Sequence, residues 1–186
     1  QPDTVCCRQP EKDLSERRYA TGQRRRRALR RYTDFIGNAT YQDFDDGNTY
    51  SLNLNNLKVE EGVTGTMRCD SRCEEPHSNF YGKGTLKIYV PWIRSDFTGD
   101  WSAFEGTVEP SNPDNWFALN NSYGIPKGTL NIPERTTVSN TAKPYTLGKV
   151  TGKGTLTGDN NTWRIGSLNE DFSFPRQDRR HRHTTD

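Results

Sequence analysis

Four cysteines and one nearby histidine are the residues best suited to forming disulfide bonds or coordinating a metal ion. Cys6 and Cys7 are adjacent, whereas Cys69, Cys73 and His77 follow one another at four-residue intervals. A ring closed between adjacent cysteines is strained, so the favoured arrangement joins Cys6 and Cys7 to Cys69 and Cys73, in either order. An even number of cysteines is typical of a secreted chain with disulfides. The weaker alternative is a zinc site of Cys69, Cys73 and His77 with one N-terminal cysteine as fourth ligand.

Three Asn-x-Ser/Thr sequons support the same cellular compartment. They begin at Asn38, Asn120 and Asn160, each at an expected turn or strand end, where an N-glycan acceptor has to lie. Together with the cysteines they predict a secreted glycoprotein. No apolar run approaches the ~18 residues of a membrane span, so no transmembrane segment is expected.

An arginine-rich segment precedes the rest of the chain. The net charge of +2 conceals +6 over residues 1–31, −6 over residues 32–175 and +2 over residues 176–186. A segment of this kind is either a protease processing site or a binder of polyanions through residues 17–31. A basic arm ahead of a β domain is also similar in plan to the coat proteins of small icosahedral viruses. The candidate residues are Arg24, Arg25, Arg26, Arg27, Arg30 and Arg31.

Catalytic groups are harder to single out. His77 is the one histidine between residues 32 and 175, which makes a catalytic triad improbable. A carboxylate pair for sugar hydrolysis is an arbitrary choice among many acids, namely Asp96, Asp100, Glu105, Glu109, Glu170 and Asp171. Aromatic rings on a flat β surface can instead stack on a sugar. Trp101 and Trp116 are the preferred candidates, because both follow turn segments.

The elements that must position these groups have the two-residue period of β-strands. In residues 85–93, Leu86, Ile88, Val90 and Trp92 alternate with more polar side chains. Residues 50–59 lose this phase at Asn55 and Asn56, as at a β-bulge. The remaining expected strands cover residues 102–109, 116–119, 129–132, 146–150, 155–156, 162–165 and 171–174.

A short repeat punctuates these strands. Gly-Thr followed by an apolar residue begins at Gly65, Gly84, Gly106, Gly128 and Gly154, at intervals of 19, 22, 22 and 26 residues. We interpret each interval as one hairpin. The fold class expected is therefore all-β, an antiparallel sandwich or barrel of eight to ten short strands.

Three regions follow: a basic arm over residues 1–36, partly helical or disordered, a β domain over 37–175, and a basic disordered tail over 176–186. The function expected is that of a secreted, disulfide-stabilised domain that acts by binding or assembly rather than catalysis. Its partner would be an acidic polysaccharide, a glycan or a protein, with self-assembly possible and no cofactor. The alternatives are a coat-like protein whose arm binds nucleic acid and a glycan-acting β-barrel enzyme.

Overall fold

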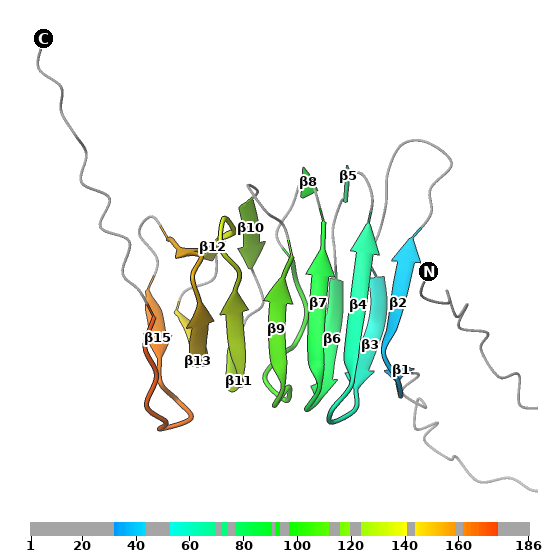
Figure 1. Cartoon of the computed structure of the whole chain (residues 1–186), viewed down its shortest axis with the longest axis horizontal. Coiled ribbons are helices and arrows are strands. Elements are labelled where there is room, and N and C mark those ends of the chain that lie inside the picture. The colour runs from blue at the N-terminus through cyan, green and yellow to red at the C-terminus, as the bar shows by residue number, and fades with distance from the viewer. Residues whose placement is uncertain are drawn as a thin grey trace, which may run out of the picture.

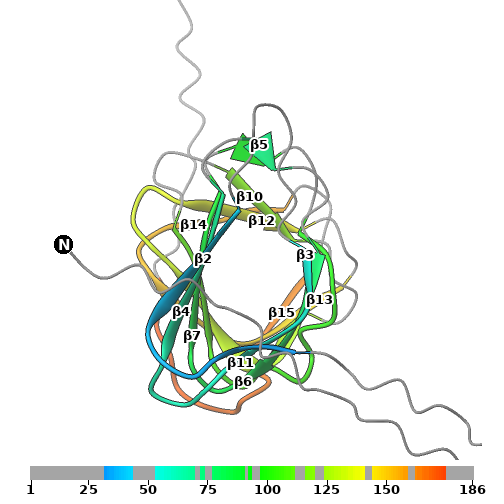
Figure 2. The ribbon, with the colours of Figure 1, turned by 90° about the vertical axis from the view of Figure 1, so that its right-hand side faces the viewer.

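The chain folds as a parallel β-solenoid in the computed structural model. The structure describes residues 32–43, 53–69, 72–73, 77–90, 92–93, 97–111, 116–119, 124–140, 144–158 and 162–174. Every strand pair within them is parallel, so the chain winds in one direction and adds a neighbouring strand at each coil. Figure 2, viewed along the rod, shows this winding as a closed outline.

A seven-stranded sheet runs the length of the rod, and its strands are neighbours in the order in which they occur in the sequence (Figure 1). Strands at ~4.8 Å spacing make its face about 29 Å long. The strands are β2 (Ala39–Asp43), β4 (Thr64–Cys69), β7 (Thr85–Tyr89), β9 (Thr107–Pro110), β11 (Ile125–Ile132), β13 (Tyr145–Gly152) and β15 (Trp163–Ile165).

Shorter ladders complete the coils. One three-stranded sheet contains β1 (Thr33–Phe35), β3 (Asn53–Val59) and β6 (His77–Gly82), and a second contains β10 (Trp116–Leu119), β12 (Thr137–Asn140) and β14 (Thr155–Leu156). β5 (Arg72–Cys73) and β8 (Trp92–Ile93) form a separate pair. Single bridges from His77 to Thr98 and from Phe97 to Leu119 connect the two three-stranded sheets.

The expected antiparallel sandwich or barrel is therefore wrong, although the expected all-β class is correct. A two-residue period shows which side chains point inward, but it is the same for both strand directions. The interval of about 22 residues is one coil, and not one hairpin, because Thr85 pairs with Thr107 and Thr107 with Thr129 in parallel register.

Individual strand predictions fared better. Leu86, Ile88 and Val90 are buried, as their alternation predicts. The predicted bulge is also confirmed: the β3–β6 register shifts between Asn53 and Asn55, and Asn55 has a φ of 55°. Residues 171–174 form no strand, and residues 33–35, at the end of the expected helical segment, form β1 instead.

The core fills the inside of the coils with one apolar residue above another. Leu86, Val108, Leu130 and Val150 are in register on successive strands and all are 0% exposed. Aromatic side chains fill the opposite side, where the Trp101 ring stacks on Phe80 with ring centroids 4.4 Å apart. The Trp101 Nε1 atom donates a hydrogen bond to the Ser78 carbonyl oxygen at 2.8 Å.

One corner of the coil has no room for side chains. Gly84, Gly106, Gly128 and Gly148 lie above one another, and a Cβ atom on each of the last three would contact the carbonyl oxygen of the glycine before it. Hydrogen bonds at the same corner join the Thr107 amide to the Gly84 carbonyl and the Thr129 amide to the Gly106 carbonyl, at 3.0 and 2.9 Å. Three of the five Gly-Thr motifs therefore mark one repeated corner of the solenoid.

Candidate functional site

The outer face of the seven-stranded sheet presents side chains in straight rows. On each strand the residues between the inward-facing ones point outward, and the parallel register places equivalent residues beside each other. One such row contains Thr64, Thr85, Thr107, Thr129 and Lys149. A second row contains Thr40, Thr66, Lys87, Glu109, Asn131 and Thr151. We refer to the second row as the polar ladder.

Four members of the polar ladder are joined by side-chain contacts. The Lys87 Nζ atom lies 3.2 Å from Glu109 Oε1, and Asn131 Nδ2 donates to Glu109 Oε2 at 2.6 Å. The Thr151 hydroxyl donates to Asn131 Oδ1 at 3.0 Å. The Glu109 side chain is only 18% exposed, because its neighbours on both sides cover it. The contacts fix the orientation of donors and acceptors across four adjacent strands.

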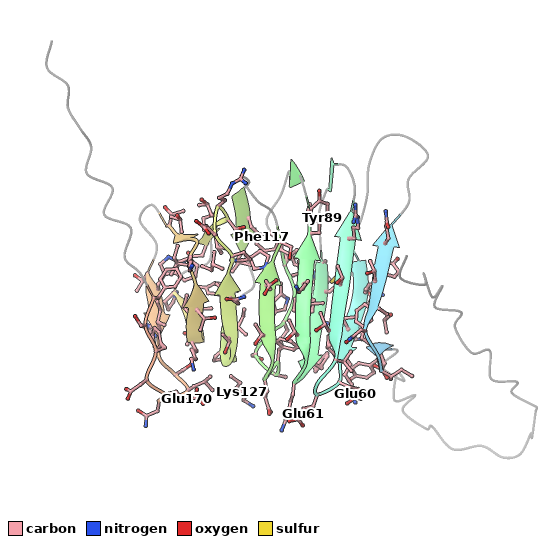
Figure 3. The ribbon with its side chains drawn as sticks, viewed as in Figure 1. Glu60, Glu61, Tyr89, Phe117, Lys127 and Glu170 are labelled. Atoms are coloured by element: carbon pink, nitrogen blue, oxygen red, sulfur yellow. The ribbon has the colours of Figure 1, made fainter. Side chains whose placement is uncertain are left out.

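An aromatic ring adjoins the ladder. Tyr89 lies two residues after Lys87 on β7, and its backbone is in register with that of Arg68 on β4. The Arg68 guanidinium carbon lies 4.9 Å from the centre of the Tyr89 ring, a cation–π contact that holds the ring against the sheet. Tyr89 is the last residue of β7, and Figure 3 shows it at the upper end of that strand. Together, the polar ladder, Arg68 and Tyr89 constitute the candidate site.

The turns at the other end of these strands carry charged side chains that pair with each other. Lys83 lies 3.4 Å from Glu105, and Lys149 lies 3.3 Å from Glu170. Lys58 pairs with Glu60, and the hydrogen bond to that carboxylate raises the pKa of Lys58. Figure 3 labels four charged residues on this side of the molecule, namely Glu60, Glu61, Lys127 and Glu170. Solvent screens exposed pairs of this kind, so they contribute little to stability, and we assign no binding role to these turns.

The structure changes the status of the expected ligand-stacking residues. Trp101 is 0% exposed and belongs to the core, which removes it from the candidates. Trp116 begins β10, but its side chain lies outside the described residues. On the outer face of the seven-stranded sheet the aromatic candidate is instead Tyr89, a half-buried residue that alternates with the buried side chains of β7.

The expected bond-forming residues are described only in part. Cys69 ends β4 and Cys73 ends β5, but their side chains, like all of Cys6 and Cys7, lie outside the described residues. His77 Nδ1 lies 2.9 Å from the Thr98 hydroxyl. No group of three His, Cys, Asp or Glu side chains that could hold a metal ion occurs within the part of the chain that the structure describes.

Of the other expected modification and binding sites, the structure describes only Asn38. Asn38 is exposed, between β1 and β2, and its Oδ1 atom accepts a hydrogen bond from the Thr64 amide at 2.7 Å. The other two sequon asparagines, Asn120 and Asn160, lie outside the described residues, as do residues 17–31, which include Arg24–Arg27, Arg30 and Arg31.

Sequence reasoning considered Glu109 only as one of many carboxylates and did not identify the polar ladder. A signal for the ladder is nevertheless present. Lys87, Glu109 and Asn131 each follow the glycine of a Gly-Thr motif by three residues, so the spacing of the motif also gives the spacing of the ladder.

Among the described residues, no helix has the length and apolar character needed to cross a membrane. Comparisons of the chain with protein-family models, with curated proteins and with solved structures gave no match.

Proposed function

We propose that the protein acts by binding, without catalysing a reaction, and that the candidate site binds an extended glycan along the solenoid axis. The observation that carries this proposal is the polar ladder, in which hydrogen-bonding side chains repeat from strand to strand over a straight face. Solenoids use such extended surfaces to bind extended partners, because each coil offers a similar contact to the next repeat.

The chemistry of the ladder favours a neutral polysaccharide at this face. Lys87 and Glu109 neutralise each other, while the Asn131 amide and the Thr151 hydroxyl supply donors and acceptors without net charge. Tyr89 adds an aromatic surface against which a sugar ring can pack. Glu109, one of the carboxylates considered for glycan hydrolysis, is instead held by Lys87 and Asn131, which favours binding over catalysis at this face.

An acidic partner is assigned to a different part of the chain. The arginines of residues 17–31 remain the proposed binding segment for an acidic polysaccharide, since clustered arginines release counterions from a polyanion. The two proposals involve separate residues, and one experiment distinguishes them.

We expect neutral polysaccharides immobilised in a native gel to retard the full chain, and heparin to retard it through the arginines. Tyr89→Ala weakens binding to the neutral polymer about tenfold, which corresponds to losing part of the ~1.5–3 kcal/mol that burial of a large apolar side chain supplies. Removal of residues 1–31 abolishes retardation by heparin and leaves retardation by the neutral polysaccharide unchanged. Tyr81→Ala, at a half-buried tyrosine on β6, is the matched control and leaves both interactions unchanged.

Failure of every neutral polysaccharide in the panel to retard the folded chain would overturn the proposal for the outer face. Equal weakening by Tyr89→Ala and Tyr81→Ala would do the same, because it would show a general loss of structure. Retention of heparin binding after removal of residues 1–31 would overturn the proposal for the arginines.

We also propose that the protein is secreted, with disulfides joining Cys6 and Cys7 to Cys69 and Cys73 and with N-linked glycans. The exposure of Asn38 supports this, since an acceptor asparagine must be reachable by the transferase. The intact mass of natively purified protein is expected to fall on glycosidase treatment and to rise by about 2 mass units per bridge on reduction. Four free thiols on an unmodified chain would contradict the proposal. Asn38→Gln is expected to remove one glycan.

A further inference from the structure

The two ends of the solenoid present matching three-residue strands. β1 starts the first described coil and β15 belongs to the last, and each has a hydrogen-bonded strand on one side only within the described residues. Figure 1 shows them at opposite ends of the rod. An edge strand of this kind displays backbone donors and acceptors that can pair with another chain.

The two strands also occupy the same place around the coil. Parallel pairs connect Phe35 through Val59 and Gly82 to Phe104, and connect Ile125 through Leu147 to Ile165. Phe104 and Ile125 are both fully buried, two and three residues before the stacked glycines Gly106 and Gly128. Phe35 and Ile165 therefore each belong to a column of paired residues that precedes the glycine corner, one in the N-terminal part of the rod and one in the C-terminal part.

Exposed apolar side chains are concentrated at these ends. Among the described residues, the exposed large hydrophobic side chains are Tyr32 at 43%, Ile36 at 82%, Ile165 at 41% and Phe172 at 37%. Tyr32 and Ile36 flank β1, whereas Ile165 lies in β15 and Phe172 follows it. Within the described residues, large hydrophobic side chains are exposed only near these two strands, which indicates that the ends are contact surfaces.

The central residues of the two terminal strands carry opposite charges. Asp34, the central residue of β1, is exposed, and so is Arg164, the central residue of β15. If β15 of one copy is placed beside β1 of the next in parallel register, Arg164 lies opposite Asp34, and Ile165 lies opposite Phe35. The strand direction, the columns of paired residues and the charges are thus all satisfied by the same arrangement.

We propose that the solenoid ends bind each other head to tail, with β15 of one copy pairing with β1 of a second copy. Arg164 meets Asp34 across the junction, and Ile165 and Phe172 pack near Ile36. The contact joins two different surfaces, so each added copy leaves a free end and the assembly grows as a chain. It is independent of the glycan-binding face, because it uses no residue of the polar ladder.

Sedimentation velocity of the full chain over a range of concentrations tests the proposal. The average mass of the wild-type protein is expected to increase with concentration. Asp34→Arg and Arg164→Asp each place like charges at the junction and weaken the association about tenfold or more. An equimolar mixture of the two variants restores association, because the altered end of one variant then faces the oppositely altered end of the other.

The mixture also serves as the folding control, since misfolded variants would not recover association. A wild-type protein that stays monomeric at the highest concentration reached would overturn the proposal. Association that is lost in only one of the two variants would overturn it as well, because that result indicates a symmetric contact between identical ends. Glycan retardation of the variants, measured in parallel, should be unchanged, which separates this contact from the proposed binding face.

Discussion

Replacement of Trp101 by alanine is expected to lower the free energy of unfolding by about 3–5 kcal/mol, a large part of the stability of a typical domain. The ring is fully buried, is stacked on Phe80 and lies 5.3 Å, centroid to centroid, from Phe97. Its removal leaves a cavity between coils that cannot collapse easily, and it deprives the Ser78 carbonyl of a hydrogen bond. Urea unfolding followed by circular dichroism measures the change.

Trp163→Ala provides the comparison for this experiment. Trp163 is also a tryptophan with a hydrogen bond from Nε1, here to the Thr157 carbonyl oxygen at 3.2 Å, but it is only half-buried at the C-terminal end of the rod. We expect it to cost less than half as much as Trp101→Ala. Similar losses for the two variants would contradict the placement of Trp101 in the centre of the aromatic core.

Gly106→Ala is expected to lower the free energy of unfolding by about 3 kcal/mol, at the upper end of the usual cost of overpacking. A Cβ atom at this position clashes with the carbonyl oxygen of Gly84 and lies 2.8 Å from both the Lys83 carbonyl carbon and Phe104 Cζ. Backbone atoms of the preceding coil cannot move aside without lengthening the hydrogen bond from Thr107 to Gly84.

Gly37→Ala is the matched control, because nothing lies within 4 Å of the Cβ position and the residue is exposed. Its stability is expected to stay within about 0.5 kcal/mol of the wild type. The two variants are compared by thermal and urea unfolding. A Gly106→Ala protein as stable as the Gly37→Ala protein would show that the corners of successive coils are not in close contact.

The sequence allowed the inward-facing residues of individual strands to be predicted, but not how the strands pair. The alternation of Leu86, Ile88 and Val90 and the loss of phase at Asn55 depend on the local backbone, which is why both predictions are confirmed. Strand direction depends on the connection. A parallel pair needs a crossover of a dozen or more residues, and an interval of 22 accommodates such a crossover as well as it does a hairpin.

The candidate site could not be predicted from the sequence for a related reason. Tyr89 and Glu109 are ordinary outward-facing residues when each strand is considered alone, and they become a surface only when Lys87, Glu109 and Asn131 are known to be neighbours. The turn before Trp101 predicts an exposed ring. That prediction is wrong, because the ring is directed into the aromatic core.

The stacked glycine corner also has a consequence for how the length of the protein can change over evolution. Gly84, Gly106 and Gly128 recur at the same interval, so a duplication or deletion of one 22-residue unit keeps the glycines, the threonines and the inward residues aligned. An insertion of a single residue within a strand would instead turn every following inward residue of that strand outward. Selection can therefore adjust this rod in whole coils, each adding or removing about 4.8 Å of binding face.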